Sequence, residues 1–137
     1  THMEFDVALA KEHSDKNPVF YVQYAHARMS SIIANTKALS PNGIKLDEIF
    51  KNKSGRDLAV KLLQFPEIVE LSTEDCQVNR LNTYAYELAS QFSQFYRDTR
   101  VIEEDNYNVG ALELVLSTRI ILAKTLSLLG ISAPEKM

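Results

Sequence analysis

The sequence has few of the residues that break or cross-link a chain. Four glycines and four prolines are spread over 137 residues, and such scarcity favours long helices over many short strands. The single cysteine, Cys76, can form neither an internal disulfide nor a Cys–Cys metal pair. Its simplest interpretation is a small apolar residue in a reducing compartment, so a disulfide-stapled fold is excluded.

The sequence also lacks a long uncharged apolar run. Its most apolar stretch, Ala111 to Leu129, contains Glu113, Arg119 and Lys124, whereas a bilayer span needs about 20 mostly apolar residues with few charges. We therefore expect a buried helix of a soluble protein here, and no membrane partner. No charged-then-apolar signal peptide opens the chain, which leads us to expect a cytoplasmic protein.

One domain is expected from the size and composition. Apolar residues make up 45% of the chain and charged residues 24%, which suits a single buried core. Residues 1–3 resemble the remnant of an expression vector, so we expect native sequence from Glu4 and one domain over residues 4–137.

No common catalytic constellation is present in the sequence. There is no Gly-rich phosphate loop and no nucleophile elbow. Histidine occurs at His2, His13 and His26, and no two native histidines have the i,i+4 spacing of a metal pair. The acidic run 103–105 belongs in a solvated loop, without the desolvation that separates the pKa values of an acid–base pair. We expect no catalytic residue, no metal site and no cofactor in this chain.

Helical periodicity predicts an all-α bundle of three long and several short helices. The long helices are expected from Asn17-Pro18 to about Ala38, from Asn79 to Val101, and from Val109 to Leu129. Asn17 suits a helix cap and Pro18 the first helical position. Gly130 suits the left-handed residue that closes a helix.

Shorter helices are expected between and before the long ones. The pattern predicts them at Glu4–Lys11, with Phe5 and Leu9 inward, around Leu46–Phe50, from a Ser54 cap to Gln64, and beyond Pro66 towards Ser72. A polar joint at 73–75 follows. No segment shows convincing strand alternation, so residues 103–108 are predicted to be a loop.

The charge is distributed unevenly along the chain. The net charge is −3, yet residues 16–61 hold eight bases and three acids, a net of +5. An acidic protein with a basic middle segment is compatible with an RNA-binding face, although most such segments are solvated surface.

Two groups of aromatic and basic residues suggest that face. Tyr21, Tyr24 and Arg28 are spaced three and four apart, on a different side from the apolar stripe of the same helix, and Tyr96 lies near Arg97 and Arg100. Aromatic rings stack on unpaired bases, and arginine meets phosphates or base edges. The pattern alone leaves an alternative open, in which the tyrosines are half-buried core residues with a solvated hydroxyl.

Longer motifs point to a family. Residues 17–28 read NPVFYVQYAHAR and residues 128–137 read LLGISAPEKM. Both resemble the C-terminal, DALR-type anticodon-binding domain of arginyl-tRNA synthetases, and the resemblance extends through Arg80-Leu81, Phe95-Tyr96 and Thr118-Arg119. It covers essentially all of residues 5–137. Lys136 departs from the family's usual arginine before the final methionine, which keeps the charge and loses the bidentate fork.

The resemblance implies a helical bundle of the class I synthetase anticodon-binding type, with the anticodon stem-loop of arginine tRNA as its partner. It implies that the full protein attaches arginine to tRNA with ATP and Mg, in a catalytic domain upstream on the same polypeptide. DNA is not an expected partner. The alternative hypothesis is a non-catalytic helical module that binds another protein. The residues that the resemblance assigns to RNA binding are Tyr21, Tyr24, His26, Arg28, Tyr96 and Met137.

Overall fold

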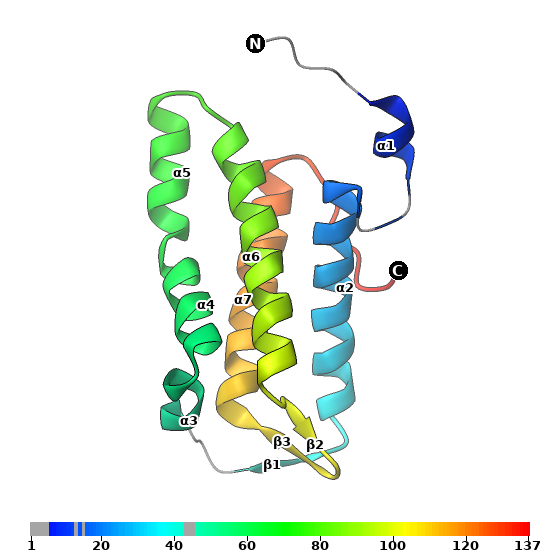
Figure 1. Ribbon diagram of the computed structural model, residues 1–137, viewed down its shortest axis with the longest axis vertical. Coiled ribbons are helices and arrows are strands. Elements are labelled where there is room, and N and C mark those ends of the chain that lie inside the picture. The colour runs from blue at the N-terminus through cyan, green and yellow to red at the C-terminus, as the bar shows by residue number, and fades with distance from the viewer. Residues whose placement is uncertain (1–5, 13, 15, 43–45) are drawn as a thin grey trace.

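Three long helices form the body of the protein. The computed structural model describes residues 6–12, 14, 16–42 and 46–137, and its long helices are α2 (Pro18–Thr36), α6 (Asn79–Asp98) and α7 (Val109–Leu128). Helices α2 and α6 run in the same direction, α7 runs in the opposite direction, and each of the three packs against the other two (Figure 1). The all-α prediction is confirmed.

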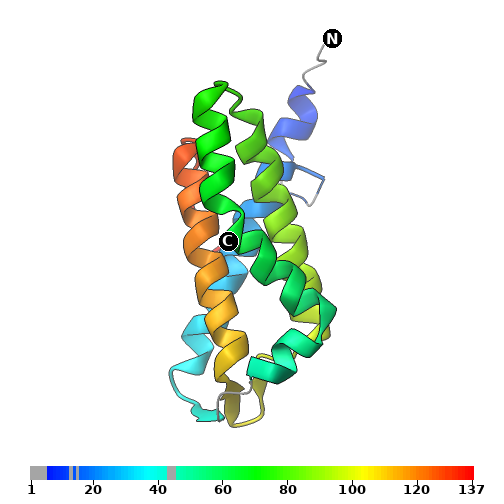
Figure 2. The same ribbon diagram turned by 90° about the vertical axis from the view of Figure 1, so that its left-hand side faces the viewer.

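Four shorter helices complete the bundle among the described residues. Helix α1 (Val7–Lys11) precedes α2, and α3 (Leu46–Lys51), α4 (Lys53–Leu63) and α5 (Phe65–Glu74) follow it. Helix α4 packs on both α6 and α7, and α5 packs on α6 (Figure 2). One flank of α6 therefore faces α4 and α5, and its other flank faces α2.

The predicted helix ends follow from local capping chemistry. The Asn17 Oδ1 atom accepts hydrogen bonds from the N–H groups of Val19 and Phe20, and Pro18 occupies the first turn. At the end of α7, Gly130 has φ +70°, and the Ile131 N–H donates to the Leu126 carbonyl. This is the Schellman arrangement that a left-handed glycine permits.

Several predicted boundaries were wrong by a few residues. Asn52, not Ser54, caps α4, because its Oδ1 atom accepts from the Ser54 N–H and Ser54 lies buried in the first turn. Helix α5 includes residues 73 and 74, so the joint to α6 begins at Asp75. Cys76 is exposed in this joint. Phe5, expected to face inward, and His13 lie outside the described residues.

A small sheet replaces the loop predicted at residues 103–108 and also includes residues 40–42. Strand β3 (Asn106–Asn108) pairs in parallel with β1 (Ser40–Asn42) and in antiparallel with β2 (Ile102–Glu103). The prediction missed these strands because two or three residues are too few for alternation to be visible, and because β1 pairs with a segment far along the chain. The sheet ties the end of α2 to the start of α7 (Figure 1).

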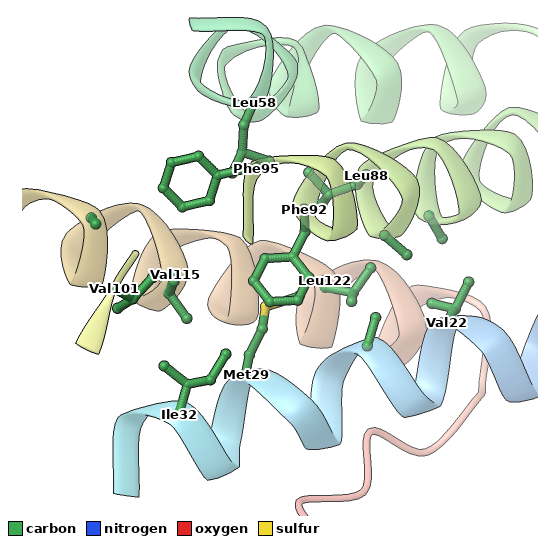
Figure 3. Packing of buried hydrophobic residues seen from close by; sticks show 14 of the residues in the cluster. Val22, Met29, Ile32, Leu58, Leu88, Phe92, Phe95, Val101, Val115 and Leu122 are labelled. Atoms are coloured by element: carbon green, nitrogen blue, oxygen red, sulfur yellow. The ribbon is translucent and has the colours of Figure 1, made fainter. Parts of the chain in front are cut away.

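The core lies between α2, α6 and α7, with Leu58 of α4 closing one side. Phe92 and Phe95 of α6 are fully buried among Met29, Leu122 and Val115 (Figure 3). Tyr84 is also buried, and its hydroxyl donates to the Lys61 carbonyl at 2.9 Å. Within the described residues no helix combines the length and apolar content that a bilayer span requires.

Candidate nucleic-acid interface

Helices α2 and α6 bring four of the six predicted residues together. Tyr21, Tyr24 and Arg28 share one side of α2 through their three- and four-residue spacing. The neighbouring α6 places Tyr96 beside Arg28, with the guanidinium carbon 4.6 Å from the centre of the tyrosine ring. This distance is that of a cation–π contact. We call these four residues the aromatic–arginine face.

A cavity of about 340 Å³ opens between the two helices at this face. Tyr24 stands at its edge with 50% of its surface exposed, so the ring is free to contact a ligand. The cavity is lined by apolar ring surface, one arginine, and three residues that carry a hydroxyl, two tyrosines and a serine. Its lining residues are Phe20, Tyr21, Tyr24, Ala25, Arg28 and Ser93.

Two rings of the face, those of Tyr21 and Tyr96, are held by contacts behind them. The Tyr21 hydroxyl lies 3.4 Å from the Ser93 Oγ atom, and its ring centre is 5.1 Å from that of Tyr86. Tyr96 packs on the fully buried Phe92, with ring centres 6.0 Å apart. Side chains held in this way lose little conformational freedom when a ligand binds, so the surface is preorganised.

Negative charge is missing from the α2 side of this interface. Helix α2 contains no aspartate or glutamate in its 19 residues. Arg28 is exposed, and among the described residues no carboxylate forms an ion pair with it. The Tyr96 ring leaves the guanidinium hydrogen-bond donors available, and these donors suit a phosphate or a base edge.

His26 and Met137 do not line the cavity. His26 is 3% exposed, and its Nδ1 atom lies 2.7 Å from the Pro134 carbonyl oxygen. One turn earlier, the Gln23 side-chain amide donates to the Ser132 carbonyl at 2.9 Å. The C-terminal segment therefore lies along α2, on a different side from the cavity, and ends at an exposed Met137. The predicted RNA contacts of His26 and Met137 stay predictions.

The sequence prediction missed Tyr86 and Ser93, which adjoin the face. A signal for Tyr86 was present in the sequence. Tyr84 belongs to the buried stripe of α6, and a residue two positions later on a helix points about 200° away. An aromatic side chain at that position had to face outward, as Tyr86 does.

The candidate face shows no sign of a catalytic or metal centre. Within the part of the chain that the structure describes, no three His, Cys, Asp or Glu side chains gather as metal ligands would. The carboxylates at 103–105 lie at the β2–β3 hairpin and are exposed to solvent. The aromatic–arginine face offers ring surface and a cation, which suits it to binding a ligand.

The fold places this module in a known class. The solved structure of the arginyl-tRNA synthetase of Thermus thermophilus contains a similar domain, with a TM-score of 0.74 and 32% sequence identity. The match covers 97% of this chain and 23% of that structure. The model of the DALR anticodon binding domain matches residues 22–137. The chain belongs to the DALR anticodon-binding domain family.

Curated relatives agree with this assignment. The arginine–tRNA ligase of Dehalococcoides mccartyi (strain CBDB1) is 42% identical over 140 residues, and that of Staphylococcus carnosus is 37% identical over 140 residues. Each match covers the whole of this chain and 25% of the relative. The chain thus spans about a quarter of the length of these relatives.

Proposed function

We propose that this chain binds the anticodon loop of an arginine tRNA as a domain of an arginine–tRNA ligase. The observation that carries the proposal is the guanidinium of Arg28 lying on the ring of Tyr96, beside the exposed ring of Tyr24. This pairing of ring and cation occurs at the edge of a cavity, on a helix without acids. The family match supports the same function.

The anticodon loop is a suitable ligand for such a surface. Its bases are unpaired, so they can leave their stack and lie against protein rings. Tyr24 offers an open ring for one base, and in this proposal Tyr96 lies near the central base of the triplet. Arg28 then contributes hydrogen bonds to a base edge or a phosphate. His26 would act indirectly, because its contact with Pro134 holds the C-terminal segment that ends in Met137.

The chemistry of the whole protein belongs to another part of the polypeptide. In this proposal a catalytic domain of the same chain joins arginine to tRNA with ATP and Mg, in the cytoplasm, and the present domain supplies tRNA recognition. The parent reading frame tests this proposal directly. An upstream region with a nucleotide-binding catalytic domain is the expected finding, and a frame without one contradicts it.

Binding of an anticodon stem-loop tests the domain itself. We expect the stem-loop of arginine tRNA to bind the 137-residue chain more tightly than a copy with its central triplet base replaced. Because phosphate contacts release counterions, affinity should fall as the salt concentration rises. Arg28→Ala should reduce the slope of log affinity against log salt concentration by about 0.7 if one phosphate contact is lost. Equal affinity for both loops, with no salt dependence, contradicts the proposal and favours a protein-binding module.

A further inference from the structure

One exposed aromatic side chain beside the cavity has no part in the function proposed so far. Tyr86 of α6 is 46% exposed and does not line the cavity. One part of its ring contacts Tyr21, with ring centres 5.1 Å apart and planes inclined by 40°. The rest of the ring faces solvent. A tyrosine held by a neighbouring ring with an open face has the form of a stacking platform.

Tyr86 lengthens the aromatic–arginine face along α6, because its ring contacts that of Tyr21. Tyr86 and Tyr96 are ten residues apart on one helix, which corresponds to about 15 Å along its axis. Nucleotides stacked at about 3.4 Å each would place roughly four in that length. The stretch of α6 from Tyr86 to Tyr96 is therefore longer than a base triplet needs, and its Tyr86 end is available to a nucleotide outside the triplet.

The charge of this part of α6 also suits a nucleic-acid strand. The two acids of α6, Glu87 and Asp98, point about 100° and 120° away from Tyr86 around the helix axis. Arg97 points the same way as Tyr86, its side chain is 76% exposed, and its nearest carboxylate is 4.0 Å away. The other residues on the Tyr86 side are neutral and hydrogen-bonding: Asn79, Asn82, Thr83, Ser90 and Ser93.

We propose that Tyr86 stacks on one nucleotide of the anticodon loop that lies outside the triplet. The inference rests on the proposed function, because it needs an RNA loop on the adjoining face. Tyr21 links the two regions, since its ring touches Tyr86 and its hydroxyl meets Ser93 at the cavity. The binding surface thus extends past the cavity towards the start of α2.

An abasic scan combined with protein variants tests the inference. Each loop nucleotide of the arginine-tRNA stem-loop is replaced in turn by an abasic residue, and binding is measured at low salt to the unmodified chain, Tyr24→Ala, Tyr86→Phe and Tyr86→Leu. Tyr86→Leu keeps apolar contact with Tyr21 and removes the stacking ring, whereas Tyr86→Phe keeps the ring. Phe50→Ala, an exposed aromatic on α3 away from the face, is the matched control.

We expect one loop position outside the triplet to couple with Tyr86. Removing that base should weaken binding to the unmodified chain and to Tyr86→Phe by roughly 5-fold or more, and should change little in Tyr86→Leu. Positions within the triplet should couple with Tyr24 instead. Phe50→Ala should behave as the unmodified chain does.

Two results overturn the inference, and they are distinguishable. If triplet positions couple with Tyr24 while no position couples with Tyr86, the binding surface ends at the cavity and Tyr86 only supports Tyr21. If no loop position couples with Tyr24 or with Tyr86, or the loop does not bind at low salt, the proposed function fails together with the inference.

Discussion

The two flanks of α6 use charged residues in opposite ways. On the flank that faces α4 and α5, Lys61 forms an ion pair with Glu87, and Arg80 forms one with Asp75. On the flank that faces α2, Arg28 lies on the ring of Tyr96 and Arg97 is mostly exposed. The cations named on the first flank are paired with carboxylates of the chain, whereas on the second flank Arg28 has no such pair among the described residues and Arg97 has only a 4.0 Å contact with Asp98.

In the proposed function, this difference is what lets a protein with a net charge of −3 offer a surface for RNA. Surface ion pairs contribute about 0–1 kcal/mol each to stability, so the charges on the α4–α5 flank stabilise the fold little. Because opposite charges are paired there, that flank also produces only a weak electrostatic potential. On the α2 flank, helix α2 contributes no carboxylate, and Arg28 forms no ion pair with any described carboxylate. Local distribution of charge, and not the total, decides attraction to phosphates.

The largest expected effect comes from the core residue that supports both flanks. Phe92→Ala should lower the free energy of unfolding by about 3–5 kcal/mol, because the ring is fully buried and the vacated space cannot collapse completely. Tyr96 also loses its support, so RNA affinity should fall in the molecules that remain folded. Urea denaturation measures the first effect. A loss below about 1 kcal/mol would show that the core repacks easily and that the flanks are not coupled through it.

The next effect separates binding from stability. Tyr24→Ala should weaken stem-loop binding by about 1–3 kcal/mol through lost stacking. The free energy of unfolding should change by less than about 0.5 kcal/mol, because half of the ring is already exposed. Fluorescence anisotropy and thermal denaturation measure the two quantities on the same samples. An unchanged affinity at a preserved fold would remove Tyr24 from the interface.

A smaller effect, on stability at alkaline pH, belongs to the α4 flank. Burial raises the pKa of Tyr84 to about 12 from its ordinary value of 10.0, because desolvation penalises the phenolate. The folded state therefore holds this proton more tightly than the unfolded state does. Its contribution to stability is complete below pH 10 and is lost as pH rises through 12.

Tyr84→Phe tests this linkage. The substitution should cost about 1 kcal/mol at neutral pH, since the hydrogen bond to the Lys61 carbonyl is lost. Between pH 10 and pH 12 the variant should lose stability less steeply than the unmodified chain. Denaturation midpoints over that range give the slopes. Parallel slopes would mean that the Tyr84 phenol titrates as it does in water.

Local chemistry made much of the fold predictable. The cap at Asn17-Pro18 and the glycine at position 130 act within one helical turn, so both were visible in the sequence and both are found. The β1–β3 pairing joins Ser40 to Asn106, and no local pattern encodes such a distant partner. The cap of α4 was misplaced because Asn52 and Ser54 are both competent caps two residues apart.

The candidate site was likewise predictable only as far as local spacing along one helix determines it. Helical spacing placed Tyr21, Tyr24 and Arg28 on one side. The approach of Tyr96 to Arg28 depends on how α6 packs against α2, which periodicity cannot give, so only the family resemblance indicated it. The contact of His26 with Pro134 joins residues 108 positions apart and was likewise invisible. It accounts for the histidine as a support for the C-terminal segment.

The smallest expected effect tests the comparison of the two flanks directly, by moving one negative charge between them. Ser90→Glu adds a carboxylate to the Tyr86 side of α6, and Glu87→Gln removes one from the α4 side, where Lys61 is its partner. Ser90→Glu should weaken RNA binding by about 0.5 kcal/mol at low salt, as expected for unit charges roughly 8 Å apart in water. Glu87→Gln should leave binding nearly unchanged and lower stability by less than about 1 kcal/mol.

Salt separates this local effect from one of net charge. Near 1 M salt the Debye length is about 3 Å, so charges are screened. Both chains should then bind the stem-loop more weakly, and the difference in affinity between Ser90→Glu and the unmodified chain should disappear. If net charge controlled binding, Glu87→Gln would strengthen it by as much as Ser90→Glu weakens it, because each changes the total by one unit. Asymmetric responses therefore assign the RNA to the α2 flank, and mirror-image responses would abolish the distinction between the flanks.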